Sequence, residues 1–416
     1  MKRISNNLPK DWTVKKLGEI FDFVQTLSLS REQLTYENTD NSIKYVHYGD
    51  IHSVYENQIL DLDSDEKTPF IKNEIILSKN ISYLQDGDLI IADASEDYEG
   101  VGECIEIKNV KNQKIVGGLH TIAVRDSTQE TVEGFRAYLF KNQAVRMTLK
   151  QNATGTSVYG ISKNTLSKLD LYLPPLPEQQ KIAQILSTWN ESIQTTQSLI
   201  KKLEIQKKGL MQRLLSSEGK NWKTYQIAEL IKPVRRPVKW DDNELYHLIS
   251  VRRRSGGAFF RESLMGSQIL TKGLFTAKKG DFLMSKMQIT HGATGLVNES
   301  LDNMKISGSY IAVVAKNTDW LNINFMNWYS RQKSFYHLCY TSSYGVHIEK
   351  MTFDFDTFLK REMTVPPIEE QTAIVKILDT AEAELNETKA YLETLKQQKT
   401  GLMQQLLTGR IIVKTK

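Results

Sequence analysis

Cysteine is scarce in this sequence, and so are long apolar stretches. The only two cysteines, Cys104 and Cys339, lie far apart and lack the CxxC or His spacing of a zinc site. We therefore expect neither a disulfide framework nor a structural metal. No window approaches 18 uncharged apolar residues, and the opening segment MKRISNNLPKDW has no apolar signal-peptide core. A cytoplasmic protein that does not span a membrane is expected.

The sequence also lacks the motifs of two kinds of enzyme. It contains no GxxxxGK(S/T) phosphate loop, so we expect no ATP-driven motor in this chain. Its Pro-Pro pairs continue into Leu176 and Ile368, not into the Tyr or Phe with which amino-methyltransferases hold a flipped base. The strongest catalytic pattern is Asp93 with Glu106 and Lys108, whose spacing loosely resembles a metal-dependent nuclease centre. We keep nuclease activity only as an alternative, because acidic surroundings weaken this pattern.

Charge is distributed unevenly along the 416 residues, whose 40% hydrophobic and 25% charged content suits two globular domains. The net charge is +5, from 54 basic and 49 acidic residues. The first lobe, residues 1–173, holds 20 basic and 25 acidic residues, whereas the second lobe, residues 218–365, holds 21 and 14. Residues 51–100 hold 3 basic and 12 acidic residues, so any nucleic-acid-facing patch of the first lobe is expected after them. This charge permits nucleic-acid binding but does not establish it.

The chain repeats itself at an offset of 192 residues. PPLPEQ at residues 174–179 corresponds to PPIEEQ at 366–371, and KKGLMQRLL at 207–215 corresponds to KTGLMQQLL at 399–407. Chance is a poor explanation for two such matches at one offset. A long internal repeat predicts a duplicated architecture.

Between these matches, apolar residues alternate at spacings of four and three in both copies. This period, sustained over more than four heptads and preceded by prolines and glutamates, predicts two helices of about 35–40 residues in a coiled coil. Two similar stripes in one chain bury each other most simply, although separate helical hairpins or ordinary core helices are the alternative. If a two-fold axis relates the lobes, the pairing is antiparallel. The predicted pairing residues are Ile182, Leu186, Trp189, Ile193, Ile200, Leu203, Leu210 and Leu214 in the first copy and Ile374, Leu378, Leu385, Leu392, Leu395, Leu402 and Leu406 in the second.

The lobes before the helices also correspond, although more weakly. Trp12 near the start of the first lobe matches Trp222, and a glycine loop at Gly155 matches one at Gly345. Apolar runs launched from Gly-Asp turns predict strands, followed in each lobe by an amphipathic helix, the glycine loop and a returning strand. The predicted fold is therefore α+β: two mixed α/β domains related by pseudo-two-fold symmetry and joined by two long helices that form an antiparallel coiled coil.

On these residues the chain resembles the specificity subunit of type I restriction-modification systems, over nearly its whole length. The resemblance rests on the two PPxxEQ segments, the two GLMQxLL helix ends and the tryptophan openings of the lobes. It implies target-recognition domains at 1–173 and 218–365, a spacer helix at 174–217, and a second spacer helix with the C-terminal tail at 366–416. It also implies that each domain reads half of a bipartite DNA site, while the helices set the gap and dock modification subunits. Because the lobes differ, we expect unlike half-sites, about one duplex turn of 34–36 Å apart.

The same resemblance implies that this chain performs no chemistry and binds no cofactor or metal. S-adenosylmethionine, ATP and Mg²⁺ are expected on partner subunits. The implied partners are double-stranded DNA, two modification (methyltransferase) subunits and, in the full complex, restriction subunits, with no membrane. A coiled-coil scaffold with protein-binding lobes is the other alternative, and salt-dependent duplex binding would separate it from a DNA reader.

Basic and polar loop residues are the candidate DNA contacts of the second lobe. Three consecutive arginines, Arg252 to Arg254, follow a predicted strand and precede a flexible Ser-Gly-Gly segment, so they could neutralise phosphates or bind guanine. A solvated charge run is the alternative. The candidates are Arg235, Arg236, Arg252, Arg253, Arg254, Lys286, Thr290, His291, Arg331, Lys333, Ser342, Ser343, Tyr344 and Gly345.

The aligned loop of the first lobe carries different neighbours around Gly155, as expected of base readers on a shared scaffold. Asn152 could pair with adenine, and basic residues of the preceding helix could engage phosphates, although a simple turn and a solvent-facing helix explain them almost as well. The HYGDIH segment at 47–52 is expected to be a strand end and a turn, not a metal site. The candidates are Lys141, Arg146, Lys150, Asn152, Thr154, Gly155, Thr156 and Ser157.

Overall fold

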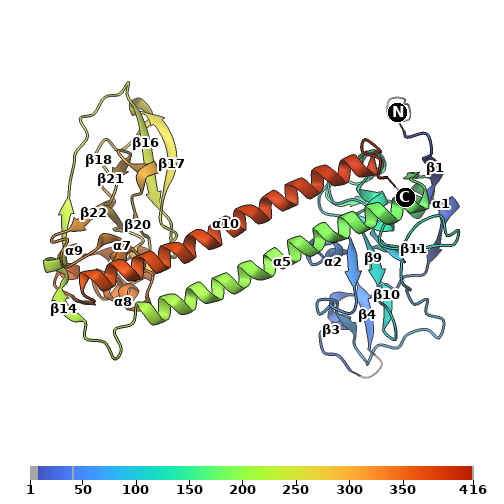
Figure 1. The fold of residues 1–416 in the computed structure, drawn as a ribbon, viewed down its shortest axis with the longest axis horizontal. Coiled ribbons are helices and arrows are strands. Elements are labelled where there is room, and N and C mark those ends of the chain that lie inside the picture. Colours follow the sequence, from blue (N-terminus) through green and yellow to red (C-terminus); the bar gives the residue numbers. More distant parts are fainter. Residues whose placement is uncertain (1–7, 40–41, 415–416) are drawn as a thin grey trace. The chain divides into compact units, whose positions relative to one another are not determined.

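The computed structural model describes residues 8–39 and 42–414, which divide into two compact units. Unit 1 contains the described residues up to Gln197 together with those from Ala390 onwards, and unit 2 spans Ser198–Lys389. Both long helices cross the boundary between these residue ranges, so each unit is completed by one part of each helix (Figure 1).

The short elements of unit 1 precede the first long helix. They are β1 (Thr13–Lys16), α1 (Leu17–Ile20), β2 (Phe21–Val24), η2 (Arg31–Gln33), β3 (Leu34–Thr35), β4 (Ile43–Val46), α2 (Tyr48–Ser53), β5 (Ile59–Asp61), β6 (Phe70–Ile71), β7 (Leu89–Ala92), β8 (Ala94–Ser95), β9 (Cys104–Lys108), β10 (Lys114–Gly117), β11 (Thr121–Asp126), η3 (Arg136–Lys141), α3 (Gln143–Asn152), β12 (Tyr159–Gly160), α4 (Lys163–Ser167) and β13 (Asp170–Leu173).

Unit 1 is built on a five-stranded sheet, β2-β11-β7-β9-β5, and a four-stranded sheet, β10-β4-β6-β3. Strand β7 is apolar at every position because both of its faces are buried. Leu89 and Ile91 pack into a core that also contains side chains of η3, α3 and the first long helix. Ile90 and Ala92, on the other face, pack with residues of the second sheet and of α2.

The short elements of unit 2 lie between the two long helices in the chain. They are β14 (Lys223–Gln226), α6 (Ile227–Leu230), β15 (Ile231–Val234), β16 (Leu245–Val251), β17 (Ala258–Met265), η4 (Gly266–Gln268), β18 (Leu274–Thr276), β19 (Phe282–Ser285), η5 (Ile289–His291), β20 (Thr294–Leu296), η6 (Glu299–Leu301), β21 (Lys305–Ser307), β22 (Tyr310–Ala315), α7 (Ile323–Tyr329), α8 (Lys333–Thr341), β23 (Ser343–Tyr344), η7 (Ile348–Lys350), β24 (Thr352–Phe353), α9 (Phe355–Leu359) and β25 (Glu362–Val365).

Unit 2 repeats this plan with sheets β15-β22-β19-β20 and β17-β16-β21-β18. Phe282 and Met284 of β19 face the core that contains α7 and α8, while Leu283 faces the second sheet, as the corresponding β7 residues do. The parallel pair β4 and β10 of unit 1 recurs as β16 and β21, and the pair β1 and β13 recurs as β14 and β25. The predicted duplication of a mixed α/β domain is therefore confirmed, and the two-fold relation between the copies stays a prediction.

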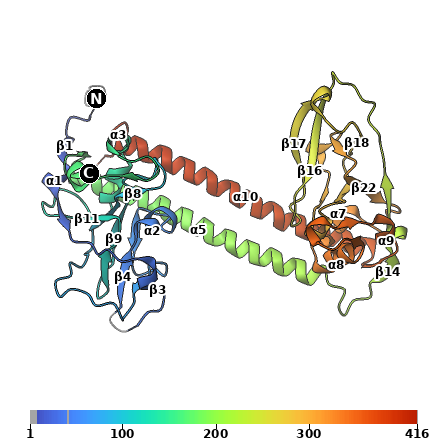
Figure 2. The same ribbon diagram turned by 180° about the vertical axis from the view of Figure 1, so that it is seen from behind.

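The units also differ, and one expectation needs correction. The single helix predicted before each glycine loop is interrupted in both units: η3 and α3 are separated at Asn142 in unit 1, and α7 and α8 break at Ser330 to Gln332 in unit 2. Trp328 and Tyr329 are buried before the break and Phe335 and Cys339 after it, so the change of direction lets both helices bury apolar side chains. The long outer strand β17 belongs only to unit 2 (Figure 2).

The two long helices are α5 (Leu176–Leu214), with 39 residues, and α10 (Ile368–Leu407), with 40. At 1.5 Å per residue each is about 60 Å long. The start of α5 packs with the end of α10 in unit 1, and the end of α5 packs with the start of α10 in unit 2, so the helices are antiparallel in each unit. Within the described chain, no helix combines the length and apolarity needed to cross a membrane.

Most of the predicted pairing side chains are buried. The four half-buried ones are Trp189, Leu210, Leu214 and Leu402. The buried ones are Ile182, Leu186, Ile193, Ile200, Leu203, Ile374, Leu378, Leu385, Leu392, Leu395 and Leu406.

A lysine interrupts each apolar stripe at the same place in the repeat. In unit 2, Lys207 Nζ of α5 lies 2.7 Å from a carboxylate oxygen of Glu382 on α10. In unit 1, Lys399 of α10 donates instead to the amide oxygen of Asn190 on α5. Burial, with help from the positive charge of Lys141, lowers the pKa of Lys399 to about 8.

The repeated PPxxEQ segments fasten the start of each long helix to its unit. Gln179 is buried, accepts from the Val132 amide at 3.0 Å, and donates to two backbone carbonyls, those of Glu130 and Pro174. Gln371 makes the same three kinds of contact in unit 2. The preceding glutamates accept from the indoles of the opening tryptophans, Glu178 from Trp12 and Glu370 from Trp222. This explains why Trp, Glu and Gln recur together in the sequence.

Candidate nucleic-acid interface

The three consecutive arginines of unit 2 lie in the turn between β16 and β17. Arg254 and Ser255 adopt left-handed backbone angles, with φ of 57° and 54°. Their amides donate to the carbonyls of His291 and Gly292, at 2.7 and 2.9 Å. The turn is therefore docked on η5 and is not a free loop.

The arginine side chains of this turn are exposed to solvent. The Arg252 guanidinium lies 3.9 Å from the centre of the Phe259 ring, which orients it. Arg253 donates to Glu349 at 3.3 Å and remains about half exposed. Ordered but solvent-accessible guanidinium groups suit contact with phosphate or guanine.

A second loop joins this surface from the other side. β23 and β24 form a two-stranded hairpin whose turn begins at Gly345, with φ of 142°. A Cβ there would lie 3.0 Å from Met351 Cα, so the turn requires glycine. Glu349 of this loop lies 3.3 Å from Arg253 and 3.3 Å from the His291 ring, although the His291 contact does not have hydrogen-bond geometry. The arginine turn, η5 and residues 344–350 thus form one surface, which we call the arginine face.

Several other candidates of unit 2 lie under or beside the arginine face. Lys286 is half-buried, and its backbone bonds to Ser309 and Phe353. Within the described residues, the buried Thr290 Oγ1 has no hydrogen-bond partner. Ser342 and Ser343 are tied to the fold, because Ser342 Oγ accepts from Arg361 and Ser343 Oγ donates to the Cys339 carbonyl. Tyr344 and Gly345 are exposed.

Four basic candidates of unit 2 lie elsewhere. Arg236 makes two hydrogen bonds to the buried carboxylate of Asp281, at 2.6 and 3.0 Å. Arg235 lies over the ring of Phe275. Arg331 stacks on the Trp328 indole beside Glu382 of α10, and Lys333 begins α8 in an exposed position. Arg236 and Arg331 have structural partners, and a DNA role for any of the four stays a prediction.

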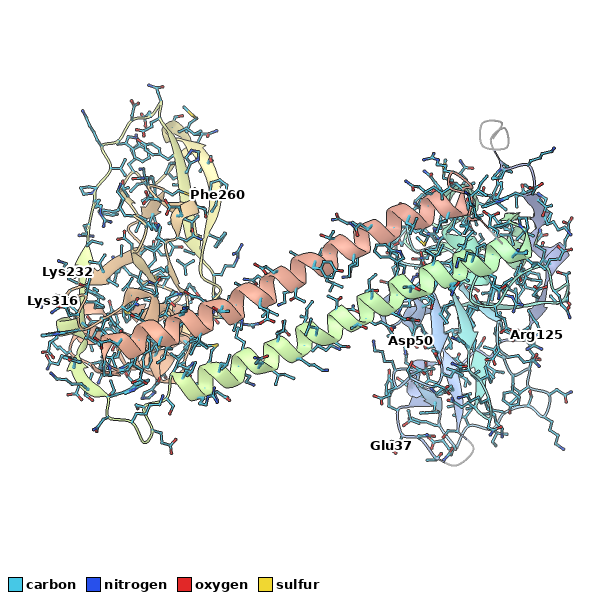
Figure 3. All side chains as sticks on the ribbon, in the orientation of Figure 1. Glu37, Asp50, Arg125, Lys232, Phe260 and Lys316 are labelled. Carbon is cyan, nitrogen blue, oxygen red and sulfur yellow. The ribbon has the colours of Figure 1, made fainter. Side chains whose placement is uncertain are left out.

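Unit 1 presents a different surface at the place of the arginine turn. The HYGDIH segment was expected to be a strand end and a turn, which is wrong: it directly follows β4, and after its N-cap His47 it forms most of the six-residue helix α2. The helix forms because the His47 ring accepts from the Gly49 amide and the buried Asp50, labelled in Figure 3, pairs with Arg31. Burial lowers the pKa of His47, which favours the neutral ring that accepts this bond.

Two further rings surround Tyr48 on α2. The centre of the Tyr48 ring lies 5.3 Å from that of His120 and 6.3 Å from that of His52, and both contacts are edge-on. His120 lies 3.3 Å from Asp93, whose pKa is raised by burial. This part of unit 1 is aromatic and histidine-rich where unit 2 has arginines.

The Gly155 loop of unit 1 is exposed, as its counterpart is. Gly155 has φ of 123°, and a Cβ there would meet the Val158 carbonyl. Thr154 bridges to Gly160, while Asn152 donates back to the Thr148 carbonyl of its own helix. The side chains of Thr156 and Ser157 are open to solvent. Their contact with bases stays a prediction.

The basic residues near α3 are held by acidic neighbours. Lys141 lies 2.5 Å from a Glu103 carboxylate oxygen, Arg146 donates to the Val101 carbonyl, and Lys150 pairs with Glu99. These contacts give the three side chains a structural role. They would reach phosphates only after these contacts open.

The alternative nuclease centre does not assemble. In the pairing of β7 with β9, Glu106 lies opposite Leu89. Asp93 follows four residues after Leu89 in the chain, so Glu106 and Asp93 are not neighbours on the sheet. The Glu106 carboxylate is buried and accepts from the amides of Gly134 and Ala137, and burial raises its pKa to about 7. It therefore supports the loop before η3.

Some residues that form or support the arginine face were not among the candidates. Phe259 orients Arg252, Tyr336 hydrogen-bonds to Ser255 at 2.7 Å, and Glu349 joins the two loops. Val346 and Ile348 are exposed on the Gly345 loop. The apolar residues after Gly345 were a usable signal in the sequence, because turns and loops are normally polar.

Comparison with known proteins agrees with this architecture. The chain is 24% identical over 98% of its length to the MjaX type I restriction enzyme specificity subunit of Methanocaldococcus jannaschii, of which 95% is covered. Its fold is similar to a type I restriction-modification S subunit from M. genitalium, with a TM-score of 0.54 at 12% identity and 96% coverage of both chains. The HsdS subunit from Thermoanaerobacter tengcongensis gives a TM-score of 0.51 at 17% identity, with 97% of this chain and 98% of that one covered. The family described as the type I restriction modification DNA specificity domain matches residues 9–205 and again 219–396. The chain therefore belongs to this family and carries two copies of its domain.

Proposed function

We propose that this chain is the DNA-reading specificity subunit of a type I restriction-modification complex, in which each unit reads one half of an asymmetric bipartite site. The observation that carries the proposal is a repeated scaffold with unlike exposed chemistry at equivalent places. The arginine turn of unit 2 stands where unit 1 has α2 with its histidines and Tyr48. A shared frame with exchanged surface residues suits two half-sites of different sequence.

The long helices are proposed to set the gap between the half-sites. Each is continuous over about 40 residues, and their paired stripes resist bending. Deleting one heptad from α5 together with the matching heptad from α10 should shorten the tolerated spacer while leaving both half-sites unchanged. An unaltered spacer length in that variant would refute this ruler role.

The outward surfaces of the same helices are proposed to dock the two modification subunits. Leu176 and Tyr391 are exposed on the helices in unit 1, and Leu199, Ile205 and Ile377 are exposed in unit 2. Exposed apolar side chains on a charged helix surface suit a protein partner. We place methyl transfer, ATP use and Mg²⁺ on partner subunits in the cytoplasm, with restriction subunits in the complete complex and no reaction on this chain.

Methylation mapping tests the proposal directly. The genome of a strain with this gene and its modification partner is sequenced for methylated bases, beside a strain that lacks only this gene. A split, asymmetric motif should be present in the first strain and lost in the second. Motifs that do not change, together with duplex binding that is absent or insensitive to salt, would favour a protein-binding scaffold.

A further inference from the structure

The loop between β23 and β24 in unit 2 presents apolar side chains to solvent. Tyr344 is 64% exposed, Val346 is 96% exposed and Ile348 is 47% exposed. Single exposed apolar residues are common on protein surfaces, but three within five residues form a patch that suits a binding partner.

This apolar loop is held in place. Ser343 and Tyr344 pair with Phe353 and Thr352, and the Phe353 amide donates to the Lys286 carbonyl at 2.9 Å. Glu349, at the far end of the loop, lies 3.3 Å from Arg253 and from His291. Because the loop is already ordered, little conformational entropy is lost when it meets a partner.

The surroundings of the loop indicate the partner's charge. The arginine face places three exposed guanidinium groups, those of Arg252, Arg253 and Arg254, beside the loop. A duplex whose phosphates bind these arginines must approach the tip at Val346. Charge complementarity therefore favours DNA over an apolar protein surface as the occupant.

The chemistry of DNA indicates which of its groups an apolar loop can contact. Phosphates, sugars and most base edges offer polar atoms, whereas the C5-methyl group of thymine is an apolar group displayed in the major groove. That groove is wide enough for a two-stranded β-ribbon, and β23 and β24 are such a ribbon with Val346 near its tip. The aligned loop of unit 1 carries Thr154 and Thr156 where unit 2 has Tyr344 and Val346. It exposes a single apolar side chain, Val158, so it lacks the three-residue patch.

We propose that Val346 and Ile348 select thymine, by packing against its C5-methyl group in the major groove, in the half-site that unit 2 reads. The inference rests on the proposed function and names the base that this loop recognises. Glu349, which lies 3.3 Å from Arg253, joins the loop to the arginine turn.

Motif mapping of variants is the first test. Val346→Ala and Ile348→Ala, alone and combined, replace exposed side chains and leave the hairpin bonds intact. The combined variant should lose selectivity at a T·A pair in one half-site and keep the other half-site and the spacer. Leu270→Ala is the matched control, because Leu270 is 100% exposed in the same unit and follows β17 at the end opposite the arginine turn. The control should keep the complete motif.

Removal of the methyl group alone is the second test. Duplexes with deoxyuridine in place of that thymine are compared with the natural site, using the full chain bound to its modification subunits. Burial of one methyl-sized group corresponds to about a fourfold change in affinity. The wild-type complex should lose about that much, and the combined variant should bind both duplexes equally.

The outcomes separate the two proposals. A wild-type split motif that is unchanged in the combined variant, or that becomes degenerate at a G·C pair, overturns thymine selection and leaves the proposed function standing. Equal wild-type affinity for thymine and uracil duplexes also overturns it. If no motif depends on this gene, the proposed function fails and thymine selection fails with it.

Discussion

Replacing Lys399 by methionine should stabilise the protein near neutral pH. Lys399 interrupts the apolar stripe of α10 and meets an amide, Asn190, where Lys207 meets the carboxylate of Glu382 in the other unit. Burial lowers the pKa of Lys399 from an ordinary 10.5 to about 8. Each pKa unit corresponds to about 1.4 kcal/mol, so holding this charge in the folded state costs about 3 kcal/mol before partial solvent screening is considered.

The expected gain is smaller than this cost, because Lys399→Met also removes the hydrogen bond to Asn190, worth about 1 kcal/mol. After solvent screening is also deducted, a net gain of about 1 kcal/mol remains, which corresponds to a rise in melting temperature of roughly 2–4 °C for a unit of this size. The gain depends on pH with a definite sign. Since the folded pKa is depressed, wild-type stability rises as pH climbs from about 8 towards 10.5, and the advantage of the variant shrinks over that range.

Calorimetric unfolding of the full chain, near pH 7 and near pH 9.5, measures this difference. Lys207→Met is the matched control, because it removes the 2.7 Å ion pair with Glu382 and leaves Arg331 3.6 Å from that carboxylate. The control should destabilise the protein at both pH values. If Lys399→Met lowers the melting temperature as much as Lys207→Met does, the hydrogen bond to Asn190 outweighs the burial cost and the reasoning is wrong.

Three further predictions concern single side chains. Burial raises the pKa of Glu106 to about 7, so the stability that this group contributes is present below about pH 4.5 and is lost as the pH rises through 7. Glu106→Gln should flatten the pH dependence of the free energy of unfolding measured in urea. An unchanged pH profile would contradict this prediction. Gln179→Ala and Gln371→Ala each leave three backbone groups without partners and should destabilise by about 2–4 kcal/mol, whereas a loss below about 1 kcal/mol in urea unfolding would show that water replaces the amide. Arg236→Lys should lower the melting temperature and leave the salt dependence of DNA binding unchanged. Arg252→Ala should leave the melting temperature unchanged and reduce the slope of the logarithm of the binding constant against the logarithm of salt concentration by about one. The reverse pattern would place Arg236 on the DNA.

The long helices were predictable because their information is local and periodic. A 3.5-residue period with prolines before it marks both the start of each helix and its buried stripe, and Ile182 and Leu378 are fully buried as the stripe requires. The repeat in turn predicted two copies of one domain. The partner of Lys399 was not predictable, because it depends on which residue the other helix brings opposite, and that is Asn190 in one unit and Glu382 in the other.

The candidate interface was predicted in part, for a physical reason. The arginine turn and both glycine loops stand out in the sequence, because glycine and consecutive arginines mark exposed backbone. Arg236 looked equally available, but the buried Asp281 that binds it is 45 residues away and only the fold brings them together. Glu349 was missed for the opposite reason, since an acidic residue beside a loop of candidate DNA contacts has no local sign of a structural role.

The interleaving of the units has a consequence for synthesis. Met403, Leu406 and Leu407 belong to the core of unit 1, and Asn142 donates its amide to the carbonyl of Leu407. The unit whose strands leave the ribosome first therefore cannot close until the last helix has emerged. At 5–20 residues per second, the wait from the middle of α5 to the end of α10 is roughly 10–40 s. During that interval the nascent chain carries an open apolar seam where the end of α10 will pack, and such exposed apolar surface is prone to aggregation.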